Sequence, residues 1–227
     1  MHAWLVGGLI AAIAAPTVLA APRLAIRGAA AQVAIVPEAR GDIAVIVTRT
    51  NRALPLKITR FGDTTYIDGA LGHRIHGCAL VAGSLGVRVR GLGTVAAGDL
   101  PHLTVRTPLN VRVTVGDGVS GAIGRSASLE FENRGCGRWT IANVRGRLSV
   151  GQFGSGESRV GQAGSADLNV AGGGAISTRD IHGPLTAVSS GAGAVQVEGV
   201  NGSVILRIAG SGSVGVQSGQ ATQLNVS

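Results

Sequence analysis

The sequence predicts an all-β protein whose chain winds into a parallel β-helix, a β-solenoid with coils of 18–19 residues. Three observations predict this fold: a regularly spaced Gly-x-Gly pattern, apolar residues that alternate around it, and a composition rich in glycine but poor in aromatics. Glycine occupies 37 of 227 positions and aromatic residues make up only 3%. Glycine weakens helices, and a narrow solenoid interior suits small branched aliphatic side chains.

The Gly-x-Gly pattern occurs six times in the second half of the chain. The triplets are Gly116-Asp117-Gly118, Gly135-Cys136-Gly137, Gly154-Ser155-Gly156, Gly172-Gly173-Gly174, Gly191-Ala192-Gly193 and Gly210-Ser211-Gly212. Successive triplets are 19, 19, 18, 19 and 19 residues apart. Self-similarity at a fixed period is typical of stacked structural repeats, so each interval predicts one coil.

Apolar residues alternate on both sides of each triplet, which is the periodicity of a β-strand. Leu148 and Val150 precede a triplet in this way, and Val195 and Val197 follow one. Each triplet is therefore predicted to be a corner between two strands. Glycine suits such a corner because it can adopt a positive φ and lacks a Cβ that could clash with the next coil. Equivalent residues should stack in one inward column, as we expect for Ile176, Val195 and Val214. The handedness stays open, although the crossover rule favours right-handed coils.

The amino-terminal half has β periodicity without the regular repeat. Residues 56–67 predict a hairpin with a turn at Gly62. The first coil of a solenoid would otherwise expose an edge, so we interpret residues 21–84 as an N-terminal β cap. Residues 85–227 are then the β-helix coils, and 21–227 form one continuous domain.

The last residues, Leu224-Asn225-Val226-Ser227, correspond to half a coil with no cap after it. An uncovered strand edge tends to recruit another strand. We therefore expect self-association, or contact with an envelope partner, through this C-terminal edge. The alternative is that Gln220, Gln223 and Asn225 keep the edge solvated.

Residues 1–20 predict a secretory signal peptide. An apolar run from residue 3 to 19 ends at Val18-Leu19-Ala20, a small-x-small cleavage site. A membrane anchor is the alternative, but the run is short and contains Pro16. The expected location is the periplasm, the outer membrane or the medium.

Two cysteines in an exported chain predict one disulfide, between Cys78 and Cys136. In a regular helix the two would lie about three coils, or roughly 14 Å, apart, which exceeds the reach of a disulfide. The bridge therefore requires residues 69–83 to fold along the side of the rod. Together with Cys78, His73 and His76 also have ligand types that suit zinc or copper. No fourth ligand is visible nearby, so we expect no metal site and no cofactor.

The formal net charge is +8, and the only local basic cluster is Arg134, Arg138, Arg145 and Arg147. This cluster is a candidate anion-binding site for an acidic polysaccharide or lipopolysaccharide. The simpler interpretation is a solvated surface. Nucleic acid is not an expected partner, because the chain carries an export signal and its arginines are thinly spread.

A polysaccharide-active enzyme is the catalytic alternative, and it would need clustered carboxylates. After Glu132 the carboxylates are only Glu157, Asp167, Asp180 and Glu198, of which Asp180, beside Arg179 and near His182, is the best candidate. Ser155 and Ser211 lie in Gly-Ser-Gly triplets, which are not the Gly-x-Ser-x-Gly of a hydrolase. We therefore expect no enzymatic activity and no catalytic residue.

Three stretches carry a resemblance to a known family: Arg23-Leu24-Ala25-Ile26-Arg27-Gly28, residues 103–111 and the Gly-Ser-Gly coils. They resemble the bacterial head GIN domain, a family described as the adhesin head of autotransporters and otherwise of unknown function. The resemblance covers residues 23–227 and implies no catalytic residues. The predicted function is that of an exported, non-enzymatic cell-envelope protein, a structural or adhesion module of unknown ligand.

Overall fold

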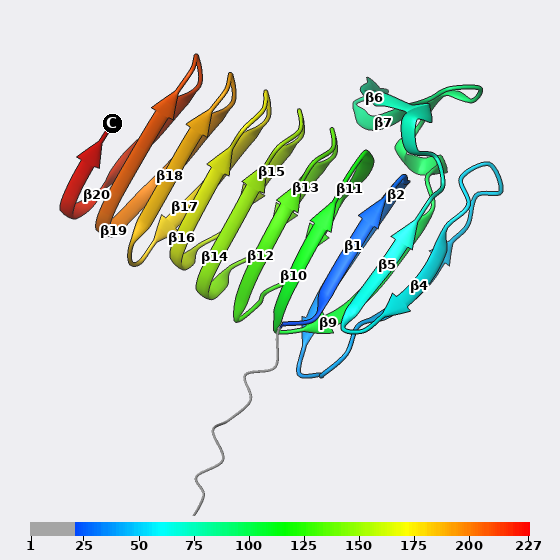
Figure 1. Ribbon diagram of the computed structural model, residues 1–227, viewed down its shortest axis with the longest axis horizontal. Coiled ribbons are helices and arrows are strands. Elements are labelled where there is room, and N and C mark those ends of the chain that lie inside the picture. Colours follow the sequence, from blue (N-terminus) through cyan, green and yellow to red (C-terminus); the bar gives the residue numbers. More distant parts are fainter. Residues whose placement is uncertain (1–20) are drawn as a thin grey trace, which may run out of the picture.

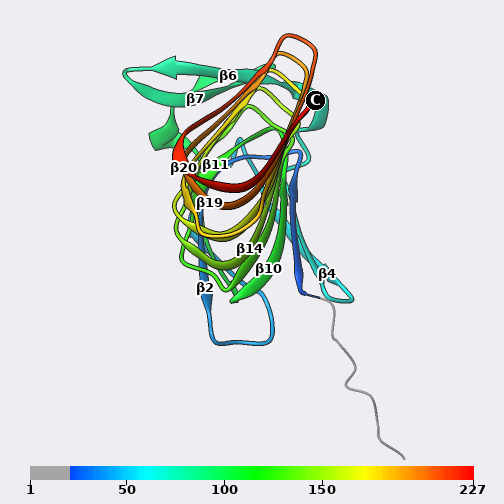
Figure 2. The same cartoon turned by 90° about the vertical axis from the view of Figure 1, so that its left-hand side faces the viewer.

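The computed structural model describes residues 21–227, and the signal peptide expected at residues 1–20 lies outside this range. The described chain is almost entirely β-structure, wound into a solenoid of about 6 turns with coils of about 19 residues. Figure 1 shows the strands side by side along a rod, and Figure 2 looks along the stacked coils. The predicted all-β parallel β-helix is confirmed.

Two ladders of parallel strands form the long sides of the rod. The first ladder contains β5 (Thr64–Asp68), β1 (Arg23–Arg27), β10 (Asn110–Val115), β12 (Ser128–Asn133), β14 (Val144–Gln152), β16 (Ala163–Val170) and β18 (Leu185–Ser190). The second ladder contains β9 (His102–Pro108), β2 (Ala30–Glu38), β11 (Gly118–Ile123), β13 (Arg138–Ile141), β15 (Glu157–Val160) and β17 (Ala175–Ile181). The long strands β19 (Ala194–Ala209) and β20 (Ser213–Val226) continue both ladders.

The remaining elements surround the first coils. Strand β3 (Ala44–Arg49) pairs antiparallel with β9, and β4 (Lys57–Phe61) pairs antiparallel with β5. A separate antiparallel sheet contains β6 (Ile75–Val81), β7 (Ser84–Val89) and β8 (Gly93–Val95). Two 3-10 turns, η1 (Gly72–Arg74) and η2 (Ala97–Asp99), flank that sheet in the chain. The hairpin expected at residues 56–67 is confirmed, with Gly62 at φ 59°.

The core is a set of stacked inward columns, as predicted. Ile176 pairs with Val195, and Val195 pairs with Val214, all in parallel register. The first two are fully buried, and Val214 packs against the same core cluster. The aromatic rings of Phe131 and Trp139 are the largest buried groups, with centroids 5.1 Å apart. Trp139 satisfies its indole N–H by donating to the Val119 carbonyl oxygen at 3.0 Å, as a buried polar group must.

The Gly-x-Gly corners depend on close approach of the backbones. A Cβ on Gly135 would overlap the carbonyl oxygen of Asp117 in the coil before it, and one on Gly172 would lie 2.8 Å from that of Phe153. Among the triplet glycines only Gly210 has a positive φ, of 107°. The sequence suggested two reasons for glycine at the corners, a positive φ and the missing Cβ. The missing Cβ is the reason that applies at nearly every corner.

Buried polar side chains fasten several corners from inside. Asn133, fully buried at the end of β12, donates from Nδ2 to the Gly137 carbonyl at 3.0 Å and accepts the Gly135 N–H at 3.1 Å. Ser189 occupies the equivalent position in a later coil and donates to Gly193 at 3.1 Å. Each side chain closes the turn around the triplet that follows it.

The amino-terminal region differs from the expected cap followed by coils. Strands β1 and β2 are themselves part of a coil, inserted between the coil of β10 and β11 on one side and the strands β5 and β9 on the other. Residues 85–95, expected at the start of the coils, instead belong to β7 and β8 of the separate antiparallel sheet. Only β3, β4 and β5 lie beyond this coil as a cap, together with β9.

Candidate binding groove

A disulfide fixes the β6–β7–β8 sheet against the solenoid. Cys78 on β6 is bonded to Cys136 in the middle of a Gly-x-Gly corner, with Cα atoms 5.7 Å apart. A second contact lies close by, where Val87 packs so tightly on Gly118 that a Cβ there would overlap it. Val87 belongs to a small second core with Leu54, Leu71 and Leu100. The predicted disulfide is confirmed, and Cys78 reaches this corner as part of strand β6 of the separate sheet.

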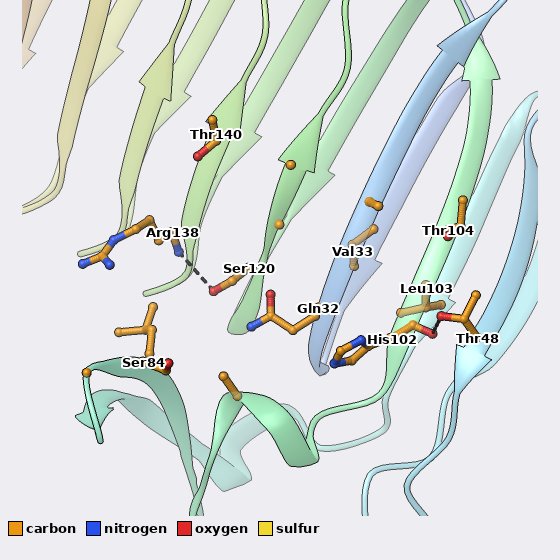
Figure 3. A pocket seen from close by; sticks show the side chains of 16 residues that line it. Gln32, Val33, Thr48, Ser84, His102, Leu103, Thr104, Ser120, Arg138 and Thr140 are labelled. Atoms are coloured by element: carbon orange, nitrogen blue, oxygen red, sulfur yellow. Dashed lines mark hydrogen bonds between the residues drawn. The ribbon is translucent and has the colours of Figure 1, made fainter.

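The docked sheet overhangs the second ladder, and an open cavity of about 620 Å³ lies between the two. The turn of the β6–β7 hairpin and Ala97 of η2 form one wall, and outward-facing residues of β9, β2, β11 and β13 form the other. Figure 3 shows Ser84 on the hairpin side opposite Gln32, Ser120 and Arg138 on the ladder. The strand register places His102, Gln32 and Ser120 side by side on adjacent strands.

The cavity is lined by polar groups of several kinds. Ser120, only 7% exposed, accepts the backbone N–H of Arg138 at 3.1 Å. Thr48 donates to the carbonyl oxygen of His102 at 3.2 Å. The Nε2 atom of His102 is buried and has no hydrogen-bond partner within residues 21–227. The cavity thus offers hydroxyl, amide, imidazole and guanidinium groups at one place.

A second cavity, of about 360 Å³, continues along the same ladder and shares Thr140 with the first. One outward row of cross-strand neighbours lines both cavities. This groove row consists of Thr104, Ala34, Ala122, Thr140, Arg159, Ser177 and Gln196. Successive strands lie about 4.8 Å apart, so the row extends over roughly 29 Å along the rod. We call the two cavities together the groove.

One carboxylate lies between the two cavities. Glu157 accepts from Arg138 at 3.1 Å and from Arg159 at 2.6 Å. This arrangement neutralises part of the positive charge of the groove and orients both guanidinium groups. In the second cavity, Arg179 and Glu198 add one charge of each sign. The groove therefore carries charges of both signs without a strong excess of either.

The structure does not bring the four arginines of the predicted anion site together. Arg134 pairs with Glu132 at a corner and lies over the Phe153 ring, whereas Arg138 lines the groove. Arg147 pairs with Asp167 at 2.7 Å and lines a cavity on the first ladder. Arg145 lines yet another cavity. One coil has about 19 residues, so a sequence cluster of this length points outward on several sides of the rod.

The other candidate residues occupy structural positions. Cys78 is bonded to Cys136, so it offers no thiolate to a metal beside His73 and His76. Within residues 21–227, no group of three or more histidines, cysteines and carboxylates is placed to hold a metal ion. Asp180 accepts the side-chain amide of Gln162 at 3.0 Å. Ser155 and Ser211 lie in the bends of their corners.

Asp117 is the one carboxyl group in the described chain whose pKa is raised. It lies at a corner with φ 57° and accepts the Gly28 N–H at 2.7 Å. Partial burial raises its pKa above the ordinary 3.8, the hydrogen bond from Gly28 opposes this, and the nearby charge of Asp68 adds to it. The Asp117 carboxyl group connects the first Gly-x-Gly triplet to the turn at Gly28, and it is not part of the groove.

Strand β20 pairs with β19 along one side, and none of the described strands pairs with its other side. Leu224 and Val226 on this strand are 62% and 59% exposed. Self-association through this edge stays a prediction. The described residues contain no helix long and apolar enough to cross a membrane.

Comparison with known proteins gives a likeness to a solved structure. No family model and no curated protein matches the sequence. Among solved structures, the chain is similar to a putative cell adhesion protein from Clostridium sporogenes, with 9% sequence identity and a TM-score of 0.28 over 87% of this chain and 92% of that chain. A TM-score of this size supports no conclusion about function, so the function has to be inferred from the groove itself.

Proposed function

We propose that this protein is an exported, non-enzymatic binding module of the cell envelope whose groove holds an extended, hydroxyl-rich chain, that is, a polysaccharide. The observation that carries the proposal is the groove row, in which outward side chains on seven neighbouring strands line two cavities that meet at Thr140. A row that repeats with every coil suits a ligand made of repeating units.

The chemistry of the row favours a sugar chain over a strongly charged polymer. Threonine, serine and glutamine side chains both donate and accept hydrogen bonds, as sugar hydroxyls do. Arg138 and Arg159 are held by Glu157, so they can donate to the ligand without creating a strong positive field. Ala34 and Ala122 leave space in the row through which a chain could pass.

The location is part of the proposal. A disulfide such as Cys78–Cys136 is typical of oxidising compartments outside the cytosol, which supports export. The resemblance to bacterial head GIN domains also remains a proposal, and it agrees with an adhesion role on the envelope. An acidic polysaccharide is the alternative ligand, but the arginines proposed for it do not form one patch.

The test is an array of linear oligosaccharides derived from bacterial surface polysaccharides, probed with the purified full-length protein. We expect retention on a subset of the array, with a signal that rises with chain length because the groove spans several coils. Mass spectrometry of the retained sugars after incubation separates binding from cleavage. Retention by no oligosaccharide would contradict the proposed ligand, and shortened chains would show an enzyme instead.

A further inference from the structure

A second candidate site lies at a different corner of the coils, where a cavity of about 410 Å³ shares no lining residue with the groove. Its chemistry comes from Arg125, Arg145, Gln162 and His182 around Gly164. We call this set the corner cleft. These residues come from four successive coils, so only the stacking of the solenoid brings them together.

The register explains how they meet. Ser126 pairs with Val144, Val144 with Ala163, and Ala163 with Ile181, and all four belong to one inward column. The residues just after this column are Ala127, Arg145, Gly164 and His182 in successive coils. Arg145 and His182 are therefore two coils apart.

Gly164, which has no side chain, lies between Arg145 and His182. A Cβ on Gly164 would lie 2.6 Å from the carbonyl oxygen of Arg145, so close backbone approach requires the glycine. The space between the two basic side chains is thus built into the coil packing.

The residues just before the inward column form the other side of the cleft. Arg125 comes first, and Asn143 and Gln162 follow in the next two coils. The backbone N–H of Gln162 donates to Asn143 Oδ1 at 3.1 Å, and its side-chain amide donates to Asp180 at 3.0 Å. These hydrogen bonds hold the amide side chains of Asn143 and Gln162 in place on this side of the cleft.

The corner cleft carries more positive than negative charge. Within residues 21–227, neither Arg125 nor Arg145 has a carboxylate within ion-pair distance, whereas Arg138 and Arg147 in the coil of Arg145 each have one. No carboxylate lines the cavity, although the lining residue Gln162 is hydrogen-bonded to the carboxylate of Asp180. All three basic side chains are exposed, so an incoming ligand can reach them.

We propose that the corner cleft binds a phosphoryl group. Each arginine presents a planar fork of N–H donors that matches the oxygens of a phosphate in bidentate fashion. Two forks and an imidazole supply more donors than the two oxygens of a carboxylate can accept, whereas a phosphoryl group offers three terminal oxygens. The group can be carried by a phosphorylated sugar, by a lipid headgroup or by free phosphate. This site is independent of the groove and of its proposed ligand.

Titration calorimetry of the full-length protein tests the proposal, with inorganic phosphate, glucose 6-phosphate and vesicles of phosphatidic acid as three separate probes and acetate as the comparator. We expect saturable binding of at least one phosphoryl probe and none of acetate. The probe that binds tightest identifies the source of the phosphoryl group. If no phosphoryl probe binds, or if acetate binds equally well, the proposal is wrong.

The double variant Arg125→Gln/Arg145→Gln should weaken that binding about tenfold or more, as expected for the loss of charge-assisted hydrogen bonds. The control Arg52→Gln/Arg207→Gln removes the same charge from exposed positions outside the cleft and should change affinity by about twofold or less. Both pairs are exposed, so circular dichroism should show an unchanged fold. Equal losses in the two double variants would show only general electrostatic attraction and would overturn the proposal.

Discussion

Cys78 and Cys136 are 58 residues apart in sequence, yet their Cα atoms lie 5.7 Å apart across a disulfide. The bridge joins the edge of a small antiparallel sheet to a corner of the solenoid. The same sheet forms one wall of the larger cavity of the groove. The covalent bond that closes the fold therefore also shapes the proposed binding surface.

Breaking this bridge should destabilise the protein. The loop-entropy model gives about 4 kcal/mol for a loop of this length. Cys136→Ser with Cys78→Ser should lower the midpoint of thermal unfolding, whereas Ser155→Ala at the equivalent place in the next triplet should leave it nearly unchanged. Thiol titration of the unreduced protein should find no free thiol, and two reactive thiols per chain would refute the bridge.

The inward column predicts the cost of a buried charge. Val195 is fully buried between Ile176 and Val214, so Val195→Asp should lower the free energy of unfolding by at least about 3 kcal/mol. The control Gln196→Asp places the same charge on the next, exposed residue and should cost within about 0.5 kcal/mol. Denaturant unfolding measures both variants. Similar costs for the two would show that the column is not inward.

The corner fastened by Asn133 gives a second stability prediction. Asn133→Ala removes two hydrogen bonds and leaves the buried N–H of Gly135 without a partner, whereas the Gly137 carbonyl keeps the Glu157 N–H as a donor at 3.3 Å. The variant should therefore cost about 1–3 kcal/mol. Asn169→Ala, on an exposed position of β16, should stay within about 0.5 kcal/mol. Urea unfolding compares them, and an Asn133→Ala variant as stable as the control would show that the side chain does not support the corner.

The raised pKa of Asp117 predicts a pH dependence. Because the folded state raises this pKa above 3.8, the stability contributed by Asp117 is fully present below about pH 3.8 and is lost as the pH rises through its folded-state pKa. Asp117→Asn cannot ionise, keeps an acceptor for the Gly28 N–H and tolerates positive φ. The variant should therefore gain stability relative to the wild type between about pH 3 and pH 7.

Denaturant unfolding of both proteins across this range measures the difference, and carboxylates that do not interact with Asp117 contribute equally to both proteins. Asp42 and Asp68 have a pKa shifted the opposite way, chiefly through hydrogen bonds from Arg40 and from the Ala70 backbone respectively. A difference between Asp117→Asn and wild type that stays constant with pH, or falls, would contradict the prediction.

Periodicity predicted the coils because each strand repeats one local pattern, and the spacing of the cysteines predicted the side loop that the disulfide needs. Two features of the fold are not predicted by the sequence pattern. The insertion of β1 and β2 between later and earlier strands depends on pairings such as Ala30 with Gly118, which are far apart in sequence and have no local signal. The polar side chain of Asn133 inside a corner interrupts the apolar alternation, so the alternation does not predict its role.

The sequence also does not predict the groove, although part of its signal is visible. In the coils the row residues are the single positions between two inward residues, as Gln196 lies between Val195 and Val197. Such positions have no periodic pattern of residue type, since Ala122, Thr140 and Ser177 all point outward but differ in chemistry. The wall supplied by the β6–β7 turn comes from tertiary docking, which the alternation of residues does not encode.

Blocking the groove tests the central claim most directly. Ala122 faces outward in the middle of the larger cavity, so Ala122→Arg should fill the groove without entering the core. Asn169→Arg adds the same side chain to an exposed position of the other ladder. The measurement is retention of wild type and both variants on the array of linear bacterial oligosaccharides. We predict that Ala122→Arg loses the retention shown by the wild type while Asn169→Arg keeps it; equal retention by all three proteins would contradict a binding site in the groove.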